Sequence, residues 1–169
     1  MSDDAFDELM GSLDHPMIVV TTAGGDERAG CLVGFHSQCG IDPAGYAVWL
    51  SKANHTYRIA ALADTFAVHF LDERQHDLAE LFGTTTEDEI DKFGRCAWTP
   101  GPGGVPLLDE CHDRFIGRRV AWLDVGPDHA CLVLAPVTAE HDATTHHLTF
   151  QQVRDLDAGH DAEERQQPG

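Results

Sequence analysis

The sequence predicts a mainly β protein with short helices, arranged as one antiparallel barrel with the helices at its edge. Runs of β-branched and aromatic residues recur along the 169 residues, and turns rich in Gly, Pro and Asp separate them. The strand–helix–strand alternation of a parallel sheet is absent from the sequence, which favours antiparallel pairing. A chain of this length suits a single domain with its own hydrophobic core.

The charge of the chain restricts its partners. With 11 basic and 29 acidic residues, the formal net charge is −18. This charge repels nucleic acid phosphates and anionic lipid, so we expect no nucleic acid partner and no membrane contact. No apolar run reaches the ~20 residues of a membrane-spanning helix, and the acidic start lacks the layout of a secretory signal. We therefore expect a cytoplasmic protein.

Cysteines and histidines are numerous but do not indicate a metal site or a disulfide framework. The five cysteines include no C-x-x-C pair, and we expect reduced, mostly buried thiols. Among the eleven histidines, His146 and His147 are adjacent and would point to opposite faces of a strand. We expect surface and core histidines, one or two of them functional, and no bound metal.

The first half of the chain predicts short strands and helices. Apolar residues at helical spacing within residues 1–14 indicate an amphipathic helix that packs on the body of the fold. The predicted strands span 17–22, 30–38, 46–51 and 66–71. Gly34 marks a bulge or a close approach within the second strand. A helix is predicted at 54–63, and another follows the fourth strand, with Asp72 as its cap and Gly83 as its end.

The second half of the chain predicts longer strands. Its expected elements are a helix start at 86–89, a Pro- and Gly-rich loop at 99–106, long strands at 113–125 and 129–139, and a short strand near 147–150. The long strands flank a turn at Gly126-Pro127-Asp128. We divide the chain into an N-terminal helix at 1–14, a barrel domain at 15–153 and a polar, flexible tail at 154–169.

One junction between a strand and a helix carries groups that suit an anion. The run Ser51-Lys52-Ala53-Asn54-His55-Thr56-Tyr57 contains a cation, a pair of hydroxyls and an amide. Free backbone N–H groups and the dipole at a helix start favour a phosphate there. Lys52 is one of only two lysines in the chain. The alternative is an ordinary helix cap by Asn54 beside a solvated Lys52.

Two further segments are candidate contacts for a ligand. Residues 30–43 place small, hydroxyl and amide residues on a strand whose main chain can meet a flat heteroaromatic ring; the alternative is a plain bulged strand. Asp128 and His129 lie at the turn between the long strands, where the imidazole can reach the edge of a ligand. The alternative there is a surface Asp–His pair.

Taken in order, these segments resemble the flavin reductase-like family of FMN-binding split barrels. The matching segments are Val19-Val20-Thr21-Thr22, residues 30–43, 50–56, 66–71 and 78–82, Lys92-Phe93, residues 104–107 and Asp128-His129. The resemblance spans roughly residues 15–140. It implies a six-stranded antiparallel Greek-key split barrel and a homodimer that binds flavin near the subunit interface.

The resemblance also implies roles for individual residues. Phosphate contacts would fall on Ser51, Lys52, Asn54 and Thr56, with His55 as a further cofactor contact. Contacts to the flavin ring would fall on Gly34, Phe35, His36, Ser37, Gln38 and Cys39, largely through the main chain. His129 matches the family's turn histidine near the nicotinamide and is the expected catalytic residue.

The family pattern is not matched at every position. Gly34 and Phe35 stand where the family usually has Asn and Ser, and His69 stands where Asn is usual. Pro127 interrupts the usual Gly-Asp-His run. Side-chain hydrogen bonds to a flavin ring would therefore differ from those of the family.

The resemblance implies a flavin-dependent oxidoreductase, an NAD(P)H:flavin reductase. Its cofactor would be FMN, or alternatively FAD, with NADH or NADPH as the reductant. A monooxygenase that consumes the reduced flavin is the expected protein partner. The alternative function is a non-catalytic module that binds a flavin or another cofactor on the same barrel.

Overall fold

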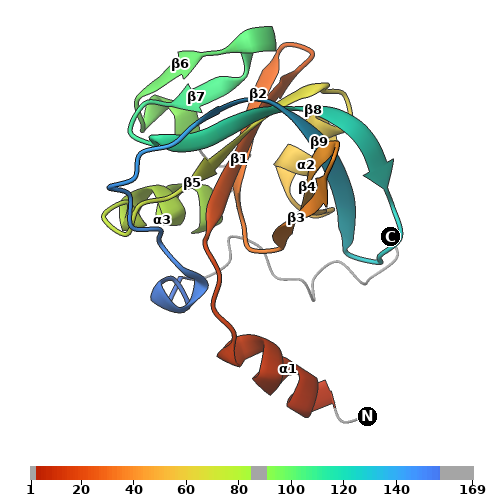
Figure 1. Ribbon diagram of the computed structural model, residues 1–169, viewed down its shortest axis with the longest axis vertical. Helices are drawn as coiled ribbons and strands as arrows, with labels where there is room; N and C mark the ends of the chain where they lie inside the picture. The colour runs from red at the N-terminus through yellow and green to blue at the C-terminus, as the bar shows by residue number, and fades with distance from the viewer. Residues whose placement is uncertain (1–2, 85–90, 157–169) are drawn as a thin grey trace.

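A seven-stranded antiparallel sheet dominates the computed structural model, which describes residues 3–84 and 91–156. The strands are β1 (Ile18–Gly24), β2 (Glu27–Val33), β3 (His36–Ile41), β4 (Ala44–Ser51), β5 (Thr65–Phe70), β8 (Asp113–Leu123) and β9 (His129–Glu140). Hydrogen bonds arrange them in the order β2-β1-β5-β8-β9-β4-β3. Figure 1 shows the strands wrapped around a common interior. The predicted mainly β class with short helices is confirmed.

The two edges of this sheet are joined by a bend at Gly34 and Phe35. These two residues alone separate β2 from β3, which are the edge strands. The Trp49 N–H of β4 donates to the Phe35 carbonyl at 2.9 Å, directly before β3 begins. The predicted single strand at 30–38 is therefore wrong, because the chain breaks at Gly34 and changes its pairing partner. The sheet therefore has seven strands, one more than the six that the resemblance implies.

The connection between β4 and β5 crosses the sheet. These strands are consecutive in the chain, yet β8 and β9 lie between them in the sheet. The intervening chain forms α2 (His55–Ala60), within the helix predicted at 54–63. A connection of this kind is the Greek-key feature of an antiparallel barrel. It places the start of α2 at the end of β4, beside the turn that enters β9.

Short elements complete the fold. They are α1 (Asp3–Ser12), α3 (His76–Thr84), a hairpin of β6 (Trp98–Pro100) and β7 (Pro106–Leu108), and the 3₁₀ turns η1 (Lys92–Gly94), η2 (Pro102–Gly104) and η3 (Phe150–Gln152). Residues 99–106, predicted as a loop, thus form the turn of this hairpin and the adjoining ends of both of its strands. No helix among the described residues is long and apolar enough to span a membrane.

Some other expectations differ from the structure. Asp72 does not cap α3, because its carboxylate accepts from the Arg74 N–H and closes a turn before the helix. The short strand near 147–150 is replaced by isolated bridges of His147 to Asp72 and of Thr149 to Pro16. The predicted helix start at 86–89 lies outside the described residues, as does the predicted tail from residue 157 onward.

The N-terminal helix forms as predicted but does not pack on the barrel. Figure 1 shows α1 projecting away from the strands. Its apolar residues Phe6, Leu9 and Met10, and Leu13 directly after it, are all exposed. The expectation that this helix lies on the body of its own chain is therefore wrong.

Two apolar clusters lie on opposite faces of β1 and β5. Phe66 and Val68 of β5 point into the barrel with Ile18 and Val20 of β1. The outer face packs under α3, η1 and β7 through a second cluster, which includes Val19, Leu71, Phe82, Phe93 and Leu108. The period of two along each strand divides its side chains between these clusters.

A buried histidine links three strands on the outer face. The His69 Nδ1–H donates to the Val19 carbonyl at 3.1 Å, and Nε2 accepts from the Leu108 N–H at 3.1 Å. Both ring nitrogens are therefore paired in the neutral form. Burial lowers the pKa of His69 to about 4. The fold thus depends on a neutral imidazole that connects β5 to β1 and β7.

We predict that His69 makes the fold sensitive to acid. An unfolded histidine binds a proton below about pH 6.5, whereas folded His69 stays neutral down to about pH 4. Its stabilisation is therefore complete above pH 6.5 and is lost as the pH falls toward 4, by ~1.4 kcal/mol per unit. His69→Gln keeps one donor and one acceptor without a titrating group.

Denaturant unfolding of both proteins at pH 7 and pH 4.5 tests this prediction. The free energy of unfolding of the wild type should fall by about 2–3 kcal/mol more than that of His69→Gln over this range. Equal losses in the two proteins would show that His69 does not titrate with folding.

Candidate functional site

A cleft of about 190 Å³ lies between the bend that joins β2 to β3 and the ends of β4 and β9. Its lining residues are Met17, Cys31, Leu32, Val33, Gly34, Phe35, Trp49, Ser51, Asn54, Gly83 and His129. Strand register explains how distant parts of the chain meet there, because Ser51 at the end of β4 pairs with His129 at the start of β9. Trp49 and Ser51 are two residues apart and therefore share a face of β4.

One end of the cleft is polar because α2 begins there. The Asn54 side chain caps the helix and accepts from the Thr56 N–H at 3.2 Å. The Ser51 hydroxyl accepts from the Ala53 N–H at 3.4 Å. The predicted helix cap by Asn54 is thus confirmed, and the hydroxyl and amide groups lie together at the cleft.

Thr56 in the first turn of α2 carries a buried hydroxyl. The residue is fully buried, and within the described part of the chain its Oγ1 has no hydrogen-bond partner. A buried hydroxyl without a partner is destabilising. Such a group beside a polar cleft suits a ligand oxygen.

Lys52 is engaged with the turn between β8 and β9. Its ammonium lies 2.5 Å from an Asp124 carboxylate oxygen and donates to the Gly126 carbonyl at 2.8 Å. The Lys52 N–H also donates to the Asp128 carbonyl at 2.8 Å. The alternative of a solvated Lys52 is therefore wrong. The ammonium holds an anion, but that anion is a carboxylate of the same chain.

His129 is oriented by its neighbour in sequence. The Asp128 carboxylate lies 3.0 Å from Nδ1 of the imidazole, so that Nδ1 donates the hydrogen bond and Nε2 is turned to the other side of the ring. This hydrogen bond, aided by the charges of His129 and Lys52, lowers the pKa of Asp128. The ring of Phe35 approaches that of His129, with 5.1 Å between the centroids. The Asp–His pair is thus formed and His129 lines the cleft, whereas its contact with a ligand stays a prediction.

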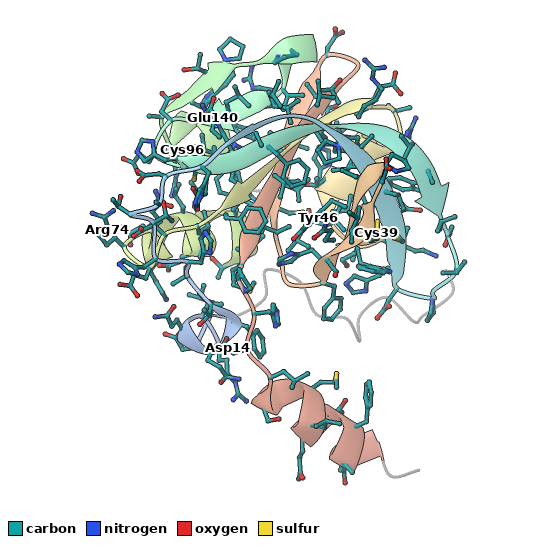
Figure 2. The ribbon with its side chains drawn as sticks, in the orientation of Figure 1. Asp14, Cys39, Tyr46, Arg74, Cys96 and Glu140 are labelled. Atoms are coloured by element: carbon teal, nitrogen blue, oxygen red, sulfur yellow. The ribbon has the colours of Figure 1, made fainter. Side chains whose placement is uncertain are left out.

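Several predicted cofactor contacts lie outside the cleft. Nε2 of His36 donates to the Pro16 carbonyl at 2.7 Å, and its Nδ1 lies 2.6 Å from the hydroxyl of Tyr46 (Figure 2). Burial lowers the pKa of His36. The other residues outside the lining are Ser37, Gln38 and Cys39, exposed on the edge strand β3, and Lys52, His55 and Thr56 near the start of α2. Of the predicted ring contacts, only Gly34 and Phe35 line the cleft.

His55 faces away from the polar end and toward β2. Its Nε2 lies 3.0 Å from the Glu27 carboxylate, and its Nδ1 lies 2.9 Å from the Arg58 guanidinium. Because Arg58 can only donate, Nδ1 accepts and Nε2 donates to Glu27. These contacts anchor α2 to β2.

Sequence reasoning missed the apolar walls of the cleft. The lining residues outside every candidate segment are Met17, Trp49 and Gly83, whereas Cys31, Leu32 and Val33 lie within the candidate segment 30–43 but were not singled out as contacts. Trp49 could have been found, because it lies two residues before Ser51 on the same strand. Gly83 could not, since its place depends on the packing of α3 on β2. A Cβ at Gly83 would lie 2.7 Å from a methyl carbon of Leu32, so the helix approaches closely here.

A second pocket, of about 230 Å³, lies away from this site. It is lined by Phe70, Asp113, Arg114, Phe115, Ala139, Glu140, His141 and His147. The Asp113 carboxylate accepts from the Asp142 N–H at 2.6 Å and from Nε2 of His147 at 2.7 Å. Burial opposes ionisation, but these hydrogen bonds prevail and lower the pKa of Asp113. The polar groups of this pocket are therefore satisfied within the chain.

Comparison with known proteins decides the family. The sequence pattern described as "Flavin reductase like domain" matches residues 10–159. The chain belongs to the flavin reductase-like family. This match includes the bend at Gly34, the start of α2 and the Asp128-His129 turn, so the cleft lies inside the region that defines the family.

Two proteins of similar sequence are named as reductases. The chain is 31% identical over 130 residues to the reductase component of the flavin-dependent trigonelline monooxygenase of Acinetobacter baylyi, covering 75% of this chain but only 40% of that protein. It is 25% identical over 143 residues to FMN reductase (NADH) RutF of Bradyrhizobium diazoefficiens, covering 85% and 78%.

A solved structure supports the same fold. The NADH:FAD oxidoreductase SgcE6 of Streptomyces globisporus C-1027 superposes with a TM-score of 0.79 at 21% identity, covering 88% of each chain. This likeness confirms the split-barrel fold.

We predict that Thr56→Val stabilises the ligand-free protein. Valine keeps the shape of threonine and removes a buried hydroxyl that has no partner in the described structure. The free energy of unfolding should rise by about 1 kcal/mol. Denaturant unfolding measures this change, with Thr56→Ser as the control that keeps the hydroxyl. A loss of stability in Thr56→Val would show that the hydroxyl is already hydrogen-bonded.

Proposed function

We propose that the protein is a flavin reductase that oxidises NADH or NADPH and reduces FMN, with FAD as the alternative flavin. The observation that carries this proposal is the meeting of an aromatic wall and a polar helix start in one cleft of a flavin reductase-like fold. A relative that aligns with most of this chain is named FMN reductase (NADH). We propose residues 15–153 as the flavin-binding unit.

The residues of the cleft fit a flavin mononucleotide. Trp49, Phe35 and the small Gly34 offer flat apolar contacts of the kind that an aromatic ring system needs. Ser51 and Asn54 of the lining offer polar contacts for a phosphate. The Thr56 hydroxyl is buried outside this lining and has no partner among the described residues, and we propose that it joins them when flavin binds. When bound, the flavin supplies the redox chemistry by accepting a hydride from the nicotinamide.

His129 is the proposed catalytic residue. Asp128 keeps the proton on Nδ1, which leaves Nε2 to approach the nicotinamide or the reduced ring. A fixed imidazole at this rim would orient the nicotinamide and stabilise negative charge that develops during reduction. Phe35, packed on His129, would shield this contact from water.

A second copy of the chain would complete the site. The cleft, at about 190 Å³, is smaller than the roughly 300 Å³ at which small-molecule sites usually begin. We propose a cytoplasmic homodimer in which the partner covers the open side of the cleft. Two relatives are named as the reductase component of a monooxygenase and as a demethylase reductase subunit. We therefore propose that this protein also delivers reduced flavin to a separate oxygenase.

Flavin binding and turnover together test the proposed function. The purified protein should bind FMN or FAD with a Kd below roughly 100 µM, and it should oxidise NADH or NADPH when flavin is added. Mass spectrometry of any co-purified molecule identifies the cofactor. Binding without oxidation of either nucleotide would favour the alternative, a non-catalytic flavin-binding module. Absence of both would contradict the proposal.

We predict that His129→Ala slows turnover far more than it weakens flavin binding. Loss of an orienting and charge-stabilising group should lower kcat/KM for NADH by about 10- to 100-fold. The FMN Kd should change less than about threefold, because the phosphate contacts remain. Steady-state kinetics and flavin titration measure the two effects. His36→Ala, outside the cleft, serves as the histidine control; equal kinetic losses in both variants would exclude a special role for His129.

We predict that Asp124→Asn tightens the binding of FMN. Asp124 holds the Lys52 ammonium at 2.5 Å, where it competes with a phosphate for the same cation. Removing this charge should lower the FMN Kd by about two- to fivefold, the size of an exposed ion pair. Riboflavin, which has no phosphate, should bind unchanged. Fluorescence titration of both flavins tests this; an equal change for both would show that Lys52 does not contact the phosphate.

A further inference from the structure

The projecting helix α1 has an apolar face that is exposed and has no packing partner among residues 3–84 and 91–156. Phe6, Leu9, Met10 and Leu13 recur at the spacing of one helical face, and their exposed fractions are 52%, 56%, 40% and 47%. The other residues of α1 include Asp4, Asp7 and Glu8, and no basic residue occurs in the helix. The helix is therefore an acidic, amphipathic element whose apolar face is open.

The direction of α1 is fixed by the C-terminal part of the fold. The Gln151 side-chain amide donates to the Gly11 carbonyl at 2.8 Å and to the Leu13 carbonyl at 2.7 Å. The Gln151 N–H donates to the Asp14 carboxylate at 3.0 Å. Asp14 lies at the joint between the helix and the body (Figure 2). These bonds fix the direction in which α1 leaves the body of the fold.

A helix this short needs tertiary contact. Isolated helices shorter than about 12 residues are marginal in water, and packing of an apolar face supplies most of their stability. The four open side chains of α1 expose on the order of 400 Å² of apolar surface. This apolar surface therefore needs another apolar surface against which it can pack.

The outer face of β8 and β9 carries two exposed apolar side chains beside an exposed cation. Pairing of these strands is interrupted by two bulges, which leave Val120 and Val137 without direct partners in the register. Both valines are exposed, at 60% and 61%. Arg118 lies between the two bulges and is also exposed. Bulges redirect side chains outward, and here they flank a cation with two apolar residues.

We propose that α1 of each protomer docks on the β8–β9 face of a second copy of this chain, through the strip formed by Arg118, Val120 and Val137. The apolar face of α1 packs on the two valines. Asp7, which flanks that face by helical geometry, pairs with Arg118. This inference names the contact surface of the proposed homodimer and rests on that part of the proposed function.

The net charge of the chain and the area of the proposed contact both favour a second copy of this chain as the partner of α1. Each protomer carries a net charge of −18, so two copies repel unless acidic elements meet basic ones. The acidic α1 and the exposed Arg118 satisfy that condition. In a two-fold dimer, the contact between α1 of one protomer and the strip of its partner occurs twice. Burial of both helix faces, each of about 400 Å², against an equal area of the partner would remove roughly 1,600 Å² in total, which is the size of a standard stable interface.

Sedimentation velocity over a range of concentrations tests the docking. The wild type should be a dimer, and Leu9→Asp and Val120→Asp should each raise the dimer Kd at least tenfold. Leu62→Asp, at a residue 71% exposed on α2's C-terminal side, is the matched control and should leave the Kd unchanged. Each variant is exposed within its own protomer, so circular dichroism and thermal melting should match the wild type.

A charge exchange makes the test specific to the proposed pair. Asp7→Arg and Arg118→Asp should each weaken the dimer, and the two together should restore the Kd to within about threefold of the wild type. Failure of the double variant to recover would overturn the docking. So would a dimer unchanged by Leu9→Asp or Val120→Asp. A wild type that stays monomeric would overturn the homodimer as well, whereas flavin turnover, assayed on the same wild-type sample, decides the proposed chemistry separately.

Discussion

The bend at Gly34 and Phe35 is the constraint on which the arrangement of the site depends. An open sheet would leave β2 and β3 as two distant edges with unpaired backbone groups. The bend makes the two edges consecutive in the chain, and the bond from the Trp49 N–H to the Phe35 carbonyl ties one edge to β4. Closure of the sheet then brings Gly34 opposite the ends of β4 and β9. The cleft exists because these three places meet.

The polar end of the cleft is built at some cost to the free protein. The Thr56 hydroxyl is buried without a partner among the described residues, and the Lys52 ammonium is held by the acidic turn before β9. A core selected for stability alone would not keep the Thr56 hydroxyl, since an apolar side chain at position 56 would serve better. Binding sites commonly retain such groups because a ligand satisfies them. The Thr56 hydroxyl, which weakens the free fold, is among the groups proposed to hold a phosphate.

Local patterns in the sequence predicted much of the fold. Alternation and turn residues located most strands, and Asn54 was identified as a helix cap because its side chain acts on a backbone group two residues away. The break at Gly34 was missed, since a glycine signals a bulge without showing that the strand changes its partner. The capture of Lys52 by Asp124 joins residues far apart in sequence, and no local pattern encodes it. The predicted position of α1 was wrong because the spacing of its apolar residues indicates that one face is buried, but does not indicate which molecule buries that face.

The central claim is that the cleft between the bend and the start of α2 binds flavin. A crystal structure of the protein with saturating FMN tests it most directly. The account predicts the ring system against Trp49 and the Gly34–Phe35 bend, with the phosphate among Ser51, Asn54 and Thr56. Flavin found instead in the pocket beside Phe70 and His147, or an empty cleft at saturating FMN, would contradict the account.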